Sequence, residues 1–240
     1  MSLTFTLKGR TSTLQSNFYP PIELDKSKQY GLALTGFTVY NSIPNIEEDN
    51  NKFYYQLSNG KEMLVEIPVG SYDIEDIERY LQTALKPDNK DAEASSSRQA
   101  ITLHSNNNTL LSELKCIYNV DFTKAETIGP LLGFSPSIYK LNTLHQSDMP
   151  VDIVKVLSIR IETNIISGAY YGDHHSHTLR EFTPVADPGY LIILEPKNLI
   201  FLPVNTFLID NISVNILDQH AKPINFRGEE IIVRLQLKPL

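Results

Sequence analysis

The chain has 240 residues, of which 41% are hydrophobic and 20% are charged, so its composition is that of a folded globular protein and not of a disordered one. The formal net charge of −7 argues against a general nucleic-acid-binding surface, which would be basic. The single cysteine, Cys116, lies in an apolar run and cannot form an internal disulfide. It predicts a buried free thiol and fits a reducing compartment.

The N-terminus has no apolar signal core, and no apolar run approaches the roughly 20 residues of a membrane-spanning helix. We therefore expect a protein without a membrane span that is made in the cytoplasm or nucleus and is not secreted by a signal peptide.

The first forty residues predict two strands separated by an irregular segment. Apolar and polar residues alternate over 3–8, which indicates a short strand. Residues 10–29 are polar and contain Pro20-Pro21, so we expect an extended arm or loop there. Residues 30–40 are rich in β-branched and aromatic side chains and predict a long strand.

A hairpin and a helix should follow. Residues 52–57 and 61–67 flank Asn59-Gly60, a pair that supplies the positive φ values of a tight hairpin turn. Residues 72–85 have apolar side chains at helical spacing and acidic residues in the first turn, with Ser71 as the expected N-cap. This segment predicts an amphipathic helix laid across a sheet.

The rest of the chain reads as loops and strands. Residues 86–99 predict a polar surface loop, and residues 123–132 a short helix ending at Gly133. Within 206–237, two alternating runs indicate two strands of a closing sheet, joined by a polar connector. Their inward residues are expected to be Ile212, Val214 and Ile216 in the first run and Ile231, Val233, Leu235 and Leu237 in the second. The other strands are expected over 100–104, 114–122, 154–166, 176–182, 190–195 and 199–204, with a loop over 135–152.

About ten to twelve strands with one helix and long loops favour two packed antiparallel sheets. We predict an all-β fold, a single jelly-roll β-sandwich with one inserted amphipathic helix. The simplest organisation has an N-terminal strand and extended arm over 1–29 and one jelly-roll domain over 30–240.

Few residues suggest chemistry. His174, His175 and His177 follow Asp173 and could hold a metal in a cupin-like enzyme, although such a loop more often holds solvated polar residues. The chain has no Gly-x-Ser-x-Gly, no phosphate loop and no dinucleotide fingerprint. The adjacent pair Glu229-Glu230 would point to opposite faces of a strand. We therefore expect neither an enzyme nor a cofactor.

One motif stands out in the connector before the last strand. Its charged residues could make an intersubunit charge pair or fix a turn, and the alternative is an ion pair within a hairpin of one chain. The residues of this predicted structural or interface motif are Asp218, Phe226, Arg227, Gly228, Glu229 and Glu230.

Several segments resemble one family, in the same order along the chain. They are the ending LDQHAKPINFRGEEIIVRLQLKPL (217–240), Ile67-Pro68-Val69-Gly70-Ser71-Tyr72, Ile128-Gly129-Pro130-Leu131-Leu132-Gly133-Phe134, and 164–182. The chain is similar in them to minor capsid proteins of Polinton/Maverick-type elements and their adintovirus relatives. His220-Ala221 departs from the glycine turn more common in that family, so the turn type is not carried over.

The resemblance implies a penton: a single jelly roll that forms homopentamers at the vertices of an icosahedral shell, beside a double jelly-roll major capsid protein. It implies a virion location, and it allows contact with a host receptor or glycan and a copy resident in a host genome. Direct nucleic-acid binding is not expected. The loops 10–29, 86–99 and 135–152 are candidates for contacts with neighbours. The alternatives are a carbohydrate- or receptor-binding jelly roll, in which Tyr170-Tyr171 would stack on sugars, and the metal-dependent enzyme.

Overall fold

The computed structural model describes residues 2–85 and 99–240, so nearly all of the predicted 86–99 loop lies outside the described residues. The chain forms two compact units. The sandwich unit comprises 1–43 and 156–240, and the inserted unit comprises 44–155. Each has a hydrophobic core of its own. The expected single domain over 30–240 is therefore divided, because the middle of the chain buries its apolar residues among themselves.

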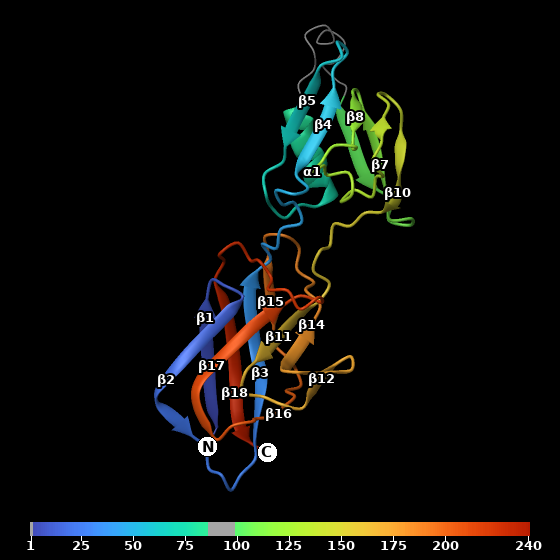
Figure 1. Cartoon of the computed structure of the whole chain (residues 1–240). Helices are drawn as coiled ribbons and strands as arrows, with labels where there is room; N and C mark the ends of the chain where they lie inside the picture. The colour runs from blue at the N-terminus through green and yellow to red at the C-terminus, as the bar shows by residue number, and fades with distance from the viewer. Residues whose placement is uncertain (1, 86–98) are drawn as a thin grey trace. The chain divides into compact units, whose positions relative to one another are not determined.

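The sandwich unit consists of two antiparallel sheets (Figure 1). Sheet A has the order β1-β18-β3-β15, with β16 also paired to β3, and sheet B has the order β14-β11-β17-β2. The strands of sheet A are β1 (Leu3–Gly9), β3 (Tyr30–Tyr40), β15 (Leu191–Leu194), β16 (Leu202–Pro203) and β18 (Ile231–Pro239). The strands of sheet B are β2 (Thr13–Glu23), β11 (Ile159–Thr163), β14 (Thr178–Phe182) and β17 (Leu208–Leu217).

The two sheets pack face to face through their apolar residues. The ring of Phe37 in sheet A lies 5.4 Å from that of Phe182 in sheet B, and Phe5 lies 5.6 Å from Phe18. Every second side chain is buried in this core along β18 and, after the register shift that follows Ile209, along β17 from Ile212 to Ile216. The alternation in the sequence therefore identified the inward faces of both strands correctly.

The partners of these two strands differ from the expected closing sheet. β17 pairs with β2 and β11 in sheet B, whereas β18 pairs with β1 and β3 in sheet A. The connector between them crosses from one sheet to the other. A period of two fixes which side chains face inward, but it does not select the strand that pairs alongside.

The expected arm is also partly a strand, since β2 occupies most of it and pairs with β17 along the edge of sheet B. Leu14 is buried in the core, and Ser16 and Phe18 continue the same face. Pro20 and Pro21 are accommodated where the register of the pair shifts. An edge strand tolerates proline there because the N–H group that proline lacks would point away from the sheet and would not bond to a neighbouring strand.

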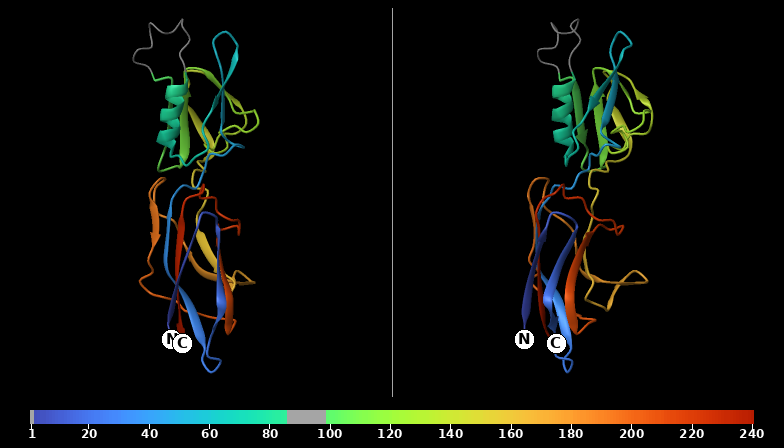
Figure 2. Two further views of the ribbon diagram at one scale, coloured as in Figure 1. Left: turned by 90° about the vertical axis from the view of Figure 1, so that its left-hand side faces the viewer. Right: turned by 60° about the vertical axis from the view of Figure 1, so that its left-hand side comes forward.

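The inserted unit contains two small antiparallel sheets and the one helix of the described residues (Figure 2). The first sheet has the order β10-β7-β6 and the second β5-β4-β8-β9. The strands are β4 (Lys52–Gln56), β5 (Glu62–Glu66), β6 (Ile101–Ser105), β7 (Leu111–Cys116), β8 (Asn119–Asp121), β9 (Ile138–Tyr139) and β10 (His145–Pro150). The predicted hairpin is confirmed as β4 and β5.

Helix α1 (Ile74–Ala84) confirms the predicted helix and packs against β6. It buries Ile77 and Leu81 in the core of the inserted unit. The N-cap is Asp73, not Ser71, because the Asp73 carboxylate accepts a hydrogen bond of 2.7 Å from the backbone N–H of Asp76. An acceptor at this position satisfies a free N–H of the first turn.

Three other expected elements differ from the structure. Residues 135–152, expected as a loop, contain strands β9 and β10. Residues 123–132 form successive turns and no helix, and Pro130 lies within them. The long strand over 154–166 is reduced to β11, and Val154 and Leu157 before it are each 60% exposed.

Candidate functional site

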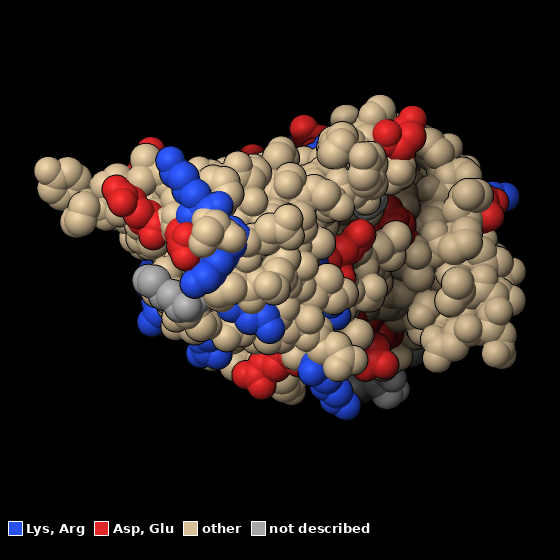
Figure 3. All heavy atoms as spheres, turned by 90° about the horizontal axis from the view of Figure 1, so that it is seen from below, with Lys and Arg blue, Asp and Glu red and all other residues tan. Residues whose placement is uncertain are grey.

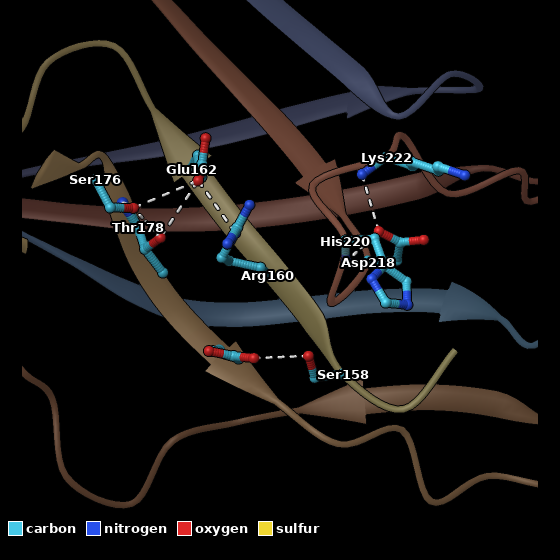
Figure 4. A network of polar contacts seen from close by, with 9 residues as sticks. Ser158, Arg160, Glu162, Ser176, Thr178, Asp218, His220 and Lys222 are labelled. Carbon is cyan, nitrogen blue, oxygen red and sulfur yellow. Dashed lines mark hydrogen bonds and ion pairs between the residues drawn. The ribbon is translucent and has the colours of Figure 1, made fainter. Parts of the chain in front are cut away.

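A polar network covers the outer face of sheet B (Figure 4). Arg160 on β11 is only 4% exposed, and its Nε lies 3.1 Å from Oε1 of Glu162. The same carboxylate oxygen lies 3.4 Å from the Thr178 hydroxyl and 3.5 Å from the Ser176 hydroxyl. An ion pair withdrawn from water costs desolvation, which the added hydroxyl contacts offset. The network ties β11 to the segment entering β14.

The connector between β17 and β18 begins with a turn organised by Asp218 (Figure 4). Its carboxylate accepts hydrogen bonds of 2.8 Å from the backbone N–H groups of His220 and Lys222. Ala221 has a φ of +62°, a conformation that glycine adopts at lower cost. The glycine expected here by resemblance is thus replaced by an alanine in a glycine-type conformation.

The connector ends in a second turn that Phe226 anchors. The Phe226 side chain is buried in the sandwich core, and its carbonyl accepts hydrogen bonds from the Ser42 hydroxyl at 2.6 Å and from the Glu229 N–H at 3.0 Å. Arg227 and Gly228 both have positive φ, +54° and +78°, as the centre of a type I′ turn requires.

The charged groups of this turn point to solvent. Arg227 and Glu230 are exposed, and within residues 2–85 and 99–240 no ion pair involves Arg227. A charge pair within one chain is therefore not what holds the turn. The interface role of the motif stays a prediction, and its geometry is that of a rigid, exposed loop.

An open pocket of about 370 Å³ lies beside the connector. One side is the β1–β2 turn with Arg10, and the other is the stretch from Pro223 to Phe226. The Ser12 hydroxyl donates to the Ile224 carbonyl and joins the two sides. Arg10 is its one charged lining residue, so the pocket offers no acid–base pair.

The histidines of the predicted cluster do not converge. His175 on strand β13 (His174–Ser176) stacks on Tyr170 of strand β12 (Ala169–Tyr171), with ring centroids 4.4 Å apart. His177 instead places Nδ1 2.9 Å from the Ile166 carbonyl. Among the residues that the structure describes, no group of three or more His, Cys, Asp or Glu is placed to hold a metal ion. The cupin-like alternative lacks a ligand set in this part of the chain.

Cys116 is buried at the end of β7, as predicted. Burial raises the pKa of its thiol to about 11. A thiol protonated at neutral pH and closed to solvent is a poor nucleophile. This residue packs the core of the inserted unit.

Sequence reasoning missed a concentration of exposed apolar residues from the end of β14 to the first residue of β17. Of the 21 large hydrophobic residues with high exposure among those described, eight lie in residues 185–208. They are Val185, Tyr190, Leu191, Ile193, Leu199, Ile200, Phe207 and Leu208. The signal was present in the run Leu191–Leu194, which is apolar at every position although its strand lies at a sheet edge. An edge strand facing water would alternate.

Charged side chains of both signs lie dispersed on the side of the molecule that Figure 3 shows, with broad uncharged areas between them. Within the described part of the chain, no helix combines the length and the apolar character needed to cross a membrane.

No protein-family model and no curated protein sequence matches the chain. Its all-β fold, however, is similar to that of a jelly-roll penton protein. One similar solved structure is the crystal structure of the selenomethionine-labelled mavirus penton protein, with 13% sequence identity and a TM-score of 0.50. The match covers 100% of this chain and 99% of that chain. The predicted fold class and the resemblance to a penton protein are both confirmed at the level of the fold.

Proposed function

We propose that the chain is a structural capsid protein of the penton type, which forms pentameric vertices of an icosahedral shell. The observation that supports this most is the extent of the structural likeness, which runs over 100% of the chain and so includes both units. A structural likeness limited to the sandwich unit would be compatible with many functions, because jelly rolls occur in capsid proteins, lectins and enzymes alike.

The chemistry of the described residues supports a structural role. The buried ion pair, the two turns of the connector and the buried Cys116 each hold the fold in place. His175 and His177 contact different neighbouring groups, and among the described residues no group of three or more His, Cys, Asp or Glu is placed to hold a metal ion. We propose further that the partners are other copies of the chain and a double jelly-roll major capsid protein, and that the chain resides in the virion. A Polinton/Maverick or adintovirus origin belongs to the same proposal.

The mass of the purified chain in solution tests this proposal. We expect static light scattering across a concentration series to give five times the 27.2 kDa of one chain. A trimer would contradict the vertex role, because a ring at a fivefold vertex needs five subunits. A strict monomer at every concentration would favour the second candidate.

The second candidate is a glycan-binding module, and the β12–β13 hairpin favours it. The Tyr170 ring is 66% exposed and is supported from behind by His175, whose Nε2 lies 3.0 Å from the phenol oxygen. A fixed, exposed aromatic ring can stack on a sugar face. Glycan-array binding that Tyr170→Ala abolishes and His175→Phe retains would support this role. No binding to any glycan would contradict it.

A further inference from the structure

The two sheets of the sandwich unit carry opposite charge. The strands of sheet A contain three basic residues and no acidic one, namely Lys8, Arg234 and Lys238. The strands of sheet B contain four carboxylates and two arginines, a difference of −2: Glu23, Glu162, Glu181 and Asp210 against Arg160 and Arg180. In a chain of net charge −7, a wholly basic sheet is an exception that calls for a partner.

The basic side chains lie on the outer face of sheet A. Lys8 pairs with Ile232 across β1 and β18, and Arg234 follows two residues later on the same face. Both are exposed, and the Lys238 ammonium lies 4.0 Å from the centre of the Phe201 ring. In the described ranges none of the three forms an ion pair. Their charge is therefore free to act on another surface.

An apolar patch adjoins these charges on the same face. Leu191 lies opposite Tyr40, and Ile193 lies opposite Thr38, which in turn pairs with Ile232. Leu191, Ile193 and Tyr40 are 41%, 59% and 48% exposed, and Tyr190 beside them is 70% exposed. At ~200 Å² of surface for a large side chain, the exposed area is roughly 400 Å². The largest apolar patch on a typical monomer has about this size and is often functional.

The outer face of sheet B offers the complement. Asp210 and Glu23 are exposed there, next to Leu208, which pairs with Glu23 and is 52% exposed. An amide pair, Asn17 and Asn211, follows Asp210 along the same two strands and is joined by a hydrogen bond of 2.7 Å. This face therefore combines acidic groups with an apolar edge. The outer face of sheet A likewise combines basic groups with an apolar patch.

We propose that the outer face of sheet A docks on the outer face of sheet B of a second copy of this chain. Two copies that each carry −7 repel each other at long range, so a stable contact needs a place where the local charges are opposite. Because the two faces differ, the contact is heterologous, and a heterologous contact closes into a ring when its rotation fits. The proposal rests on the ring-forming function proposed above and names the surfaces that would build the ring.

The apolar patch supplies about half of the ~800 Å² that one partner buries in a standard interface. The charged and amide groups around it would supply the rest as a polar rim. The contact should therefore weaken as salt is added, because the charges at its rim are screened.

Charge reversal tests the contact. The double variant Lys8→Glu, Arg234→Glu should raise the dissociation constant of the assembly at least ~tenfold, measured by light scattering at low salt. Adding Glu23→Lys and Asp210→Lys to the same chain should restore assembly, because both faces then carry reversed charge. Lys26→Glu, an exposed residue outside the strands, is the matched control and should assemble as the wild type does. Equal assembly of all variants would overturn the proposal.

Chemical cross-linking with a bis-maleimide gives an independent test, since the only native cysteine is buried. The double variant Ile193→Cys, Asp210→Cys should give a ladder beyond the dimer, whereas either single variant should give none. Covalent dimers from Ile193→Cys alone would show a symmetric contact and overturn the proposal. A wild-type chain that stays monomeric at every concentration would overturn it as well.

The two proposals can fail separately. The number of subunits tests the vertex role, and the dependence on the two faces tests the contact. A trimer that requires both faces would contradict the pentamer and support the contact. A pentamer that forms equally well after charge reversal, and that gives no ladder of cross-linked products, would support the vertex role and overturn the proposed contact.

Discussion

Gly133, which lies in one of the segments resembling penton proteins, should not tolerate even alanine. Its φ is +80°, and a Cβ on this residue would overlap the carbonyl oxygen of Met149 and lie 2.9 Å from its carbon. The left-handed conformation alone costs alanine about 1–2 kcal/mol. The clash would also displace β10, whose Met149 N–H donates to the Gly133 carbonyl at 3.0 Å, and loss of a buried hydrogen bond adds about 1–3 kcal/mol. We expect Gly133→Ala to destabilise the inserted unit by about 2–5 kcal/mol in total.

Gly60→Ala is the matched control in the same unit. Gly60 has a φ of +82°, and a Cβ there would meet nothing within 4 Å, so only the conformational cost of about 1–2 kcal/mol remains. The rate at which Cys116 reacts with a thiol reagent in increasing denaturant measures the opening of this unit, because the thiol is buried in its core. Equal destabilisation by the two substitutions would refute the close approach of Gly133 to Met149.

Three further predictions concern stability. Ala221→Gly should stabilise the sandwich unit by about 1 kcal/mol in chemical denaturation because it removes a left-handed alanine, and no gain would contradict the turn geometry. Glu162→Gln should destabilise the same unit by about 2–4 kcal/mol, since it removes the carboxylate beside the buried Arg160, and the double variant Arg160→Met, Glu162→Leu should lose less. If the double variant loses more stability than Glu162→Gln, the ion pair is net stabilising and the expectation is contradicted. Burial raises the pKa of the Cys116 thiol from 9.0 to about 11, so its contribution to stability is complete below pH 9 and is lost as the pH rises towards 11. The free energy of unfolding should fall over this range in the wild type and remain flatter in Cys116→Ala.

Local patterns in the sequence predicted most strands of the fold. Residues 30–40 form β3 with those bounds, because β-branched and aromatic side chains fill the centre of a sheet. Asn59-Gly60 predicted the hairpin, and the spacing of Ile77 and Leu81 predicted the helix. These elements are determined by residues close together in the chain.

Long-range organisation was not predictable in the same way. The division into two units depends on which apolar residues share a core, and Ile43 and Val156, which lie at the crossing points, carry no composition change that marks a linker. Pro20-Pro21 indicated a loop because a proline pair usually interrupts strands, whereas the register shift of β2 absorbs it. The pairing of β17 and β18 with different sheets depends on the whole topology.

In the candidate site, too, the sequence predicted features that depend on nearby residues and not those that depend on long-range pairing. The sequence identified the connector motif, and the structure shows its two turns, with Asp218 in one and Phe226 in the other. The opposite charge of the two sheets could not be read from the sequence, because Lys8 and Arg234 are 226 positions apart and become neighbours only through the pairing of β1 with β18. Leu191 and Ile193 were expected in a strand, but their exposure depends on its position at the sheet edge.

The rotational symmetry of the assembled particle tests the central claim most directly. Single-particle electron microscopy of the purified chain at low salt should show rings whose end-on class averages have fivefold symmetry. Rings with any other symmetry, or isolated single chains at all concentrations, would contradict the proposal that this protein forms the vertices of a capsid.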